Sequence, residues 1–243
     1  MKISFRHGWA MLSAAVLSLT ALPLSAVSSV TSLSAAAAAA PVVENLDRGI
    51  VAIKSGNGML VSWRFLASDP TGTEFRLYRD DQLLMTSKGD EATCFYDESG
   101  SVSARYRVDS LVNGTVQTTS TCSLISGTDY FQIPMDVPTA SDCTYSPNDC
   151  SVGDVDGDGV YELFVKWDPS NSKDNSQKGK TGNVYIDCYK LTGEKLWRID
   201  MGKNIRAGAH YTQFMVFDLD GDGKAEVVMK TSDGTKDGKG KII

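Results

Sequence analysis

The sequence is poor in histidine, contains an odd number of cysteines and has few long apolar runs. Only two histidines occur, and the one beyond the first forty residues is His210. Five cysteines leave at least one thiol unpaired within the chain; Cys143 and Cys150 could close a small loop, but spacing does not fix the pairing. A catalytic thiol needs a nearby base, so we assign no chemistry to the cysteines. A lone histidine in a Gly/Ala-rich turn is more typical of a packing residue.

The only strongly apolar run lies at the start of the chain. Lys2 and Arg6 precede an apolar stretch from about residue 9 to residue 27, and six alanines, Ala35–Ala40, follow. This order is typical of a secretory signal peptide that is cleaved after small residues. Pro23 and several serines disfavour a retained transmembrane helix, and no later segment is apolar enough to span a bilayer. We therefore expect residues 1–40 to be a signal peptide and the protein to be secreted.

The charge balance is acidic. The chain has 24 Lys and Arg against 30 Asp and Glu; residues 1–40 hold two of the basic residues and none of the acidic ones, so the mature net charge is −8. An acidic chain without a basic patch is a poor ligand for nucleic acid. We expect a monomer that binds neither nucleic acid nor, after signal cleavage, a membrane.

A nine-residue acidic pattern occurs twice. The copies are Asp154–Glu162 (DVDGDGVYE) and Asp218–Glu226 (DLDGDGKAE), and their first residues lie 64 positions apart. Clustered carboxylates repel one another unless a cation lies among them, and Ca²⁺ is the hard cation that takes six to eight oxygen ligands. The sequence therefore predicts a calcium-binding loop that is repeated.

The pattern resembles an EF-hand loop only in its first half. Asp at positions one, three and five and Gly at position six agree with an EF-hand, but position twelve is Val165 or Met229 and the acid comes at position nine. The following residues are β-branched and apolar, which favours strand, calcium loop, strand. A solvated Asp-Gly hairpin turn is the alternative for a single copy. The expected metal ligands, for ions that are mainly structural, are Asp149, Asp154, Asp156, Asp158, Glu162, Asp218, Asp220, Asp222, Lys224 and Glu226.

Two regions differ in composition. Residues 41–125 contain short alternating segments (59–65, 75–79 and 104–108) separated by Gly, Asn and Asp turns, which predicts an antiparallel sandwich of the fibronectin III-like kind. Residues 126–243 are richer in Gly, Asp and aromatics, and 183–190 with 195–200 read as a hairpin. We expect an all-β protein in which the sandwich precedes a calcium-stabilised β-propeller.

The four strands of one propeller-like blade are predicted at 163–167, 183–190, 195–200 and 213–217. Residues 168–182 are polar and Gly/Ser/Asn/Lys-rich, which indicates a loop over one face, where binding sites often lie. Because one or two blades cannot close a propeller, we expect a truncated chain that represents the front part of a longer protein.

Three longer segments resemble a known family. They are 145–159, 166–175 and 202–214, with a weaker similarity at Arg48-Gly49 and Val61–Arg64. They resemble the bacterial rhamnogalacturonan lyases of polysaccharide lyase family 11, whose members have an N-terminal β-sheet domain and a propeller. The resemblance covers the mature chain from about residue 41 to residue 243.

The resemblance implies cleavage of the rhamnogalacturonan I backbone of pectin by β-elimination at galacturonate. In that family a base removes the C5 proton, and Ca²⁺ on the adjacent carboxylate stabilises the charge that develops. By position, Asn148 and Asp168 match residues that line the family's cleft, and we expect them to bind substrate. The proton-abstracting base is expected beyond residue 243, and endo or exo action stays open.

Two alternatives remain. A non-enzymatic calcium propeller for carbohydrate binding or adhesion would share the aspartate loops but would need no base. A truncated, inactive carbohydrate-binding remnant would expose an unpaired blade and aggregate.

Overall fold

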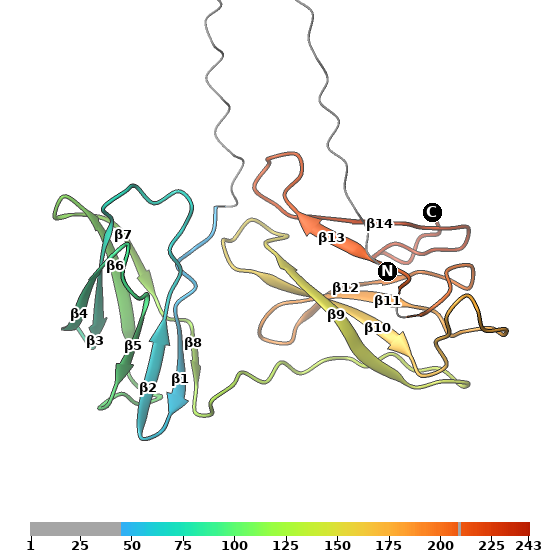
Figure 1. The fold of residues 1–243 in the computed structure, drawn as a ribbon, viewed down its shortest axis with the longest axis horizontal. Helices are drawn as coiled ribbons and strands as arrows, with labels where there is room; N and C mark the ends of the chain where they lie inside the picture. Colours follow the sequence, from blue (N-terminus) through green and yellow to red (C-terminus); the bar gives the residue numbers. More distant parts are fainter. Residues whose placement is uncertain (1–44, 209) are drawn as a thin grey trace, which may run out of the picture. The chain divides into compact units, whose positions relative to one another are not determined.

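The computed structural model describes residues 45–208 and 210–243, and every regular element in that part of the chain is a β-strand (Figure 1). The prediction of an all-β fold is therefore confirmed for these residues. The expected signal peptide, residues 1–40, lies outside them. No helix in the described ranges is long and apolar enough to cross a bilayer.

Two four-stranded sheets form the N-terminal region (Figure 1). The first sheet has the order β5 (Cys94–Asp97), β2 (Gly58–Ser62), β1 (Val51–Ser55) and β8 (Leu124–Ser126). The second has the order β4 (Gln82–Lys88), β3 (Glu74–Arg79), β6 (Tyr106–Val112) and β7 (Thr115–Thr121). All pairings are antiparallel except that of β1 with β8, which is parallel.

The two sheets share one apolar core. Ala52 and Val61 from the first sheet and Phe75, Leu77 and Val108 from the second are fully buried in one cluster. The core residues of β3 alternate with half-buried ones, since successive side chains of a strand point to opposite faces. The alternation of apolar and polar residues, from which the sequence predicts these strands, therefore also places the apolar side chains in the core.

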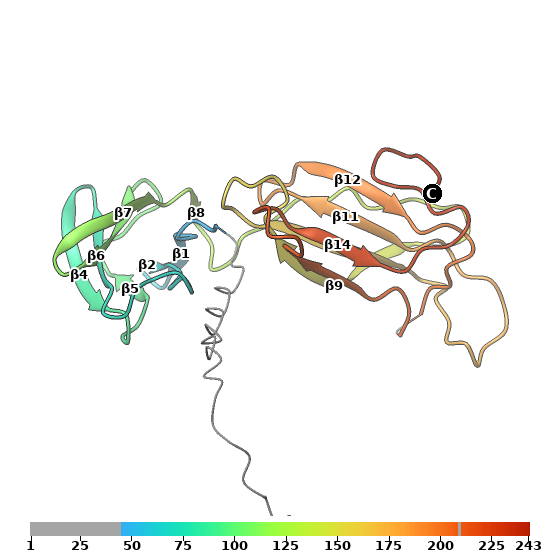
Figure 2. The same ribbon diagram turned by 90° about the horizontal axis from the view of Figure 1, so that it is seen from above.

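A third four-stranded sheet follows, with the order β12 (Lys195–Asp200), β11 (Tyr185–Tyr189), β10 (Glu162–Pro169) and β9 (Tyr145–Gly153), all antiparallel (Figure 1). Figure 2 shows β12 and β11 side by side. Strands β13 (Phe214–Phe217) and β14 (Glu226–Met229) pair only with each other. The prediction that 213–217 is the fourth strand of this sheet is therefore wrong. Tyr145–Gly153 takes that place, at the sheet edge, where Pro147 is tolerated because an edge strand can lack one donor.

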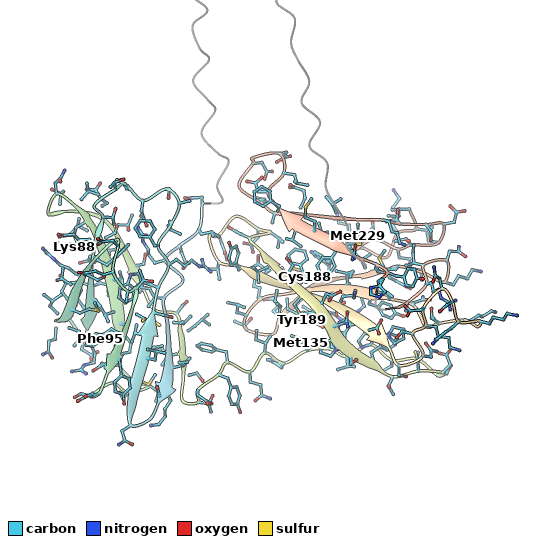
Figure 3. The ribbon with its side chains drawn as sticks, in the orientation of Figure 1. Lys88, Phe95, Met135, Cys188, Tyr189 and Met229 are labelled. Carbon is cyan, nitrogen blue, oxygen red and sulfur yellow. The ribbon has the colours of Figure 1, made fainter. Side chains whose placement is uncertain are left out.

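Both faces of the two central strands of the third sheet, β10 and β11, are largely buried. Val165, Trp167 and Tyr189 form one cluster, against which Met135 packs next to Tyr189 (Figure 3). The opposite face contributes Ile186 to a second cluster. A sheet that is covered on both sides is rigid, and it fixes the ends of its strands and the loops that join them.

One buried carboxylate locks the hairpin of this sheet. Asp187 is fully buried and accepts hydrogen bonds from Trp167 Nε1 at 2.8 Å, Tyr189 OH at 2.7 Å and Arg198 Nε at 2.7 Å. A buried charge is tolerated only when it is paired and hydrogen-bonded in this way. The arrangement joins β10, β11 and β12 through side chains as well as through the main chain.

The second strand pair packs directly on the end of β9. A Cβ atom on Gly153 would lie 2.6 Å from Val216 Cγ1 and 2.7 Å from Ala225 Cβ. Ala225 N also donates to Asp154 O at 2.6 Å. Only glycine permits this approach, which brings the two acidic loops side by side.

Candidate metal loops and sugar-binding face

The first acidic loop closes around Asp154. This side chain is 1% exposed, and its carboxylate accepts hydrogen bonds from Gly157 N at 2.7 Å, Gly159 N at 2.8 Å and Asp158 N at 3.2 Å. Glu162, also buried, accepts from Val155 N at 2.9 Å and so joins the two ends of the loop. The hydrogen bonds that these two carboxylates accept hold the loop in its closed conformation.

The second loop repeats this geometry. Asp218 accepts from Gly221 N at 2.8 Å and Gly223 N at 3.0 Å, and Glu226 accepts from Leu219 N at 2.8 Å. All four loop glycines have φ between 79° and 89°, a region that side chains with a Cβ rarely adopt. Two sequences with different spacer residues therefore adopt one backbone conformation.

Each loop brings three carboxylates within ligand distance of one another. In each group one oxygen per residue lies within 4.8 Å of the others. The groups are Asp154, Asp156 and Glu162, and Asp218, Asp220 and Glu226. Burial, with a smaller contribution from the nearby carboxylates of Asp156 and Asp158, raises the pKa of Glu162 above its ordinary value. Both groups fit a hard cation with oxygen ligands.

The remaining predicted ligands are not part of these two carboxylate groups. Asp158 and Asp222 lie in the loops but outside the groups, and each carboxylate accepts a main-chain N–H two residues on, from Val160 and Lys224. The Lys224 side chain is exposed. Asp149 is not part of the first group; its carboxylate pairs with Lys166 Nζ.

A lysine reaches into the first loop and not into the second. Lys190 Nζ lies 2.6 Å from Asp156 Oδ2, 3.4 Å from Asp158 Oδ2 and 3.5 Å from Glu162 Oε1. The hydrogen bond with Asp156, with further attraction from Glu162, raises the pKa of Lys190 well above its usual range. Among the described residues no cationic side chain forms an ion pair with the second loop. The loops share a fold but differ in the charge that faces them.

Asn148 lies in a bulge between β9 and β10, and Asp168 lies on β10 next to that bulge, opposite Ser146. The register shifts between Val165 and Trp167, so that Asn148 and Asp149 both lie opposite Lys166. Asn148 is exposed and Asp168 is half-buried, and neither side chain makes a hydrogen bond to another residue in the described ranges. A bulge of this kind re-aims side chains next to a site. The two polar groups are available for a ligand.

The loop of residues 170–184 is held by one arginine that sequence reasoning missed. Arg206 donates from Nε to Lys173 O at 3.0 Å, from Nη1 to Gly179 O at 2.9 Å and from Nη2 to Asp174 O at 3.0 Å. The rigid guanidinium satisfies several carbonyls at once. The loop follows directly on the strand that carries Asp168, and no local pattern around Arg206 predicts this role.

Histidine and cysteine contribute no candidate chemistry. His210 is exposed, so the expectation of a packing role is wrong for this residue. All five cysteines are free thiols, and burial raises the pKa of Cys188 to about 12, which keeps it protonated and unreactive. The candidate site therefore consists of the acidic loops and of the polar residues Asn148 on β9 and Asp168 on β10, which we call the polar face.

Two family models match the chain. The model "Rhamnogalacturonan I lyases beta-sheet domain" matches residues 41–124, and "Rhamnogalacturonan lyase family 11, C-terminal domain" matches residues 130–243. The chain belongs to rhamnogalacturonan lyase family 11. The matched regions contain the two-sheet region and the sheet that bears the acidic loops, respectively.

Two curated proteins that are similar to this chain come from Bacillus subtilis. The rhamnogalacturonan endolyase YesW of Bacillus subtilis (strain 168) is 56% identical over 211 residues, which is 84% of this chain and 34% of the relative. The rhamnogalacturonan exolyase YesX of the same organism is 50% identical over 207 residues, 83% of this chain and 34% of the relative. The chain thus spans about a third of the length of the curated relatives that it matches.

Solved structures agree with this assignment. The crystal structure of YesW has a TM-score of 0.76 and 56% identity, with 83% of this chain and 35% of that chain covered. The structure of a Bacillus licheniformis rhamnogalacturonan lyase has a TM-score of 0.73 and 51% identity, with 83% of this chain and 35% of that chain covered. Family 11 members that are similar to this chain therefore include both an endolyase and an exolyase.

Proposed function

We propose that this chain functions as a rhamnogalacturonan lyase, which cleaves the rhamnogalacturonan I backbone of pectin by β-elimination. The observation that carries the proposal is 56% identity over 211 residues to a rhamnogalacturonan endolyase. The polar face on β9 and β10 lies inside the region of similarity. The same identity supports a propeller for the region that starts at the third sheet.

The reaction breaks the bond at O4 of a galacturonate residue. A base removes the C5 proton, negative charge develops on the carboxylate side of that carbon, and the O4 leaving group departs to leave a 4,5-unsaturated uronate. Calcium, when bound, supplies charge compensation both for the aspartate loops and for the galacturonate carboxylate at the point of cleavage. We assign the base to none of the residues described above.

Asn148 and Asp168 take the role of substrate binding. The Asn148 amide both donates and accepts, and the Asp168 carboxylate accepts from sugar hydroxyls. Asn148 is exposed and Asp168 is half-buried, and the lack of side-chain hydrogen-bond partners for both in the described ranges supports this role. The two acidic groups, built on Asp154 and Asp218, hold structural calcium at the edge of the sheet.

The remaining parts of the proposal concern the setting. A leader at residues 1–40 directs the protein out of the cell, where calcium is abundant enough for loops of this type. The partner is a pectic polysaccharide, and the protein acts as a monomer. Mass measurement of the protein from the culture medium tests the export step, because cleavage after the alanine run removes about the first forty residues.

The test uses the purified gene product that carries these residues. Rhamnogalacturonan I is added, and the ultraviolet absorbance of unsaturated uronates is followed with calcium and with excess chelator. We expect a calcium-dependent rise, little rise with a polygalacturonate that lacks rhamnose, and a loss in Asn148→Ala and Asp168→Ala. No rise from folded, calcium-loaded protein overturns the lyase proposal and leaves a binding or adhesion propeller.

A further inference from the structure

Lys166 is a buried charge with an incomplete environment. Its side chain is 2% exposed, and within the described ranges its one hydrogen-bond partner is the carboxylate of Asp149, a side chain that is 59% exposed. An ammonium group has three donors, so two of them have no acceptor among these residues. Removing a charge from water costs several kcal/mol unless the pairing is complete. We therefore expect the buried ammonium group of Lys166 to have a specific role in the protein.

The repeat within the chain shows that the fold does not require it. Lys230 occupies the aligned position, 64 residues later, yet it is exposed and lies 5.6 Å from the centre of the Tyr211 ring. Gln213 stands where Asp149 stands in the first copy. The strand pair of the second copy begins at Phe214 opposite Met229, without a bulge. The acidic loop forms in both copies, so the buried ion pair is not needed to fold it.

The ion pair coincides with the polar face. The bulge sets Asn148 and Asp149 opposite Lys166, and Asp168 follows two residues after Lys166, on the same side of β10. At the bulge two residues of β9 face one residue of β10, which locally disrupts the regular ladder of main-chain hydrogen bonds. The bond from Lys166 to Asp149 is the side-chain contact that ties the bulged segment to β10.

We propose that Lys166 is a positioning residue for sugar binding. Through Asp149 it fixes the bulge, and so orients the Asn148 amide beside Asp168 to accept and donate to hydroxyls of the polysaccharide backbone. It also offsets the charge of Asp149, which would otherwise repel a polyanionic uronate chain. This inference rests on the proposed function, because it assigns a role in binding the same substrate.

The experiment compares three single variants in the purified gene product with rhamnogalacturonan I. Lys166→Met removes the charge and keeps the length, Asp149→Asn removes the other partner at an exposed site, and Lys230→Met is the control at the aligned position. We expect KM to rise about tenfold in the first two variants with kcat within about twofold, because binding is lost without loss of transition-state contacts. Lys230→Met should match the wild type in both constants.

Two further variants test the mechanism. The double variant Lys166→Met/Asp149→Asn should raise KM no more than one single variant does, since both remove one interaction. Lys166→Arg should recover part of the loss, because it keeps the charge while changing its geometry.

The outcomes separate a positioning role from a structural one. If Lys166→Met lowers the melting temperature and leaves KM unchanged, the ion pair serves stability alone and the inference is wrong. If Lys166→Met does not fold, Asp149→Asn decides, and an unchanged KM there overturns it. An inactive wild type is a distinct result, which refutes the proposed function and this inference with it.

Discussion

Replacing Asp154 with alanine tests how the first acidic loop is held together. The carboxylate accepts three main-chain hydrogen bonds, at 2.7, 2.8 and 3.2 Å, from a position that is 1% exposed. Bonds to a charged acceptor contribute about 1.5–3 kcal/mol each. Part of this is recovered because the N–H groups of the exposed residues Gly157 and Asp158 can bond to water, whereas that of buried Gly159 cannot. We therefore expect Asp154→Ala to reduce the free energy of unfolding by roughly 3–5 kcal/mol.

Asp156 provides the matched comparison within the same loop. Its carboxylate accepts one main-chain hydrogen bond, from Asp158 N at 3.2 Å, and pairs with the partly exposed Lys190. Because exposed ion pairs contribute little, Asp156→Ala should cost less than about 1 kcal/mol in chelator. Both residues belong to the same predicted metal group, so they should differ in folding of the loop but not in metal binding.

The assay is thermal unfolding in excess chelator and in calcium. A cost of 3–5 kcal/mol lowers the melting temperature by roughly 6–20 °C for a domain of about this size, at about 2–4 °C per kcal/mol. Calcium at about 100 times Kd adds about 2.7 kcal/mol of stability per intact site. The Asp156→Ala variant should therefore lose the stabilisation that calcium gives through the first loop, and this loss should be seen only when calcium is present. Equal shifts for the two variants in chelator, or an undiminished calcium effect in Asp156→Ala, would refute the reasoning.

Three further predictions follow from charged contacts. Lys190→Met removes the ammonium that faces the first loop, so calcium should bind that loop more tightly. Calorimetry measures the calcium affinity of both loops, and the affinity of the second loop should be unchanged. Arg198→Met strips the bidentate partner from fully buried Asp187 and should cost about 3–5 kcal/mol in urea unfolding, whereas the exposed Arg105→Met costs under about 1 kcal/mol. Burial raises the pKa of Asp69, but hydrogen bonds from a buried arginine outweigh it and lower the pKa below its ordinary value. The stability that this pairing gives is present above that value and is lost as the pH falls through the folded-state pKa, so Asp69→Asn should flatten the acid side of a stability profile; an unchanged slope contradicts this.

Local patterns in the sequence predict much of the fold. The alternation around Phe75 and Leu77 and the apolar runs that follow each acidic loop do form strands. Tyr145–Gly153 was not predicted as a whole strand because Pro147 and Asn148 favour a turn in isolation. Edge position and the bulge, which depend on the partner strand, make the extended conformation possible there.

The candidate site divides in the same way. The acidic loops are predictable because their ligands lie within nine consecutive residues, and the main-chain bonds to Asp154 and Asp218 are local. The contacts of Lys166 and Lys190 join residues 17 and 34 positions apart in the chain, which the pairing of the strands brings together. Such contacts depend on register, which a single sequence does not state. Arg206 was missed for the same reason.

The most direct test of the central claim is the chemical identity of the products from rhamnogalacturonan I. The purified gene product is incubated with the polysaccharide in calcium and in chelator, and the oligosaccharides are weighed by mass spectrometry. The account predicts products with an unsaturated galacturonate at the new non-reducing end, each lighter by one water than a hydrolysis product, and none in chelator. Saturated products of hydrolysis, or no cleavage by folded protein in calcium, would contradict it.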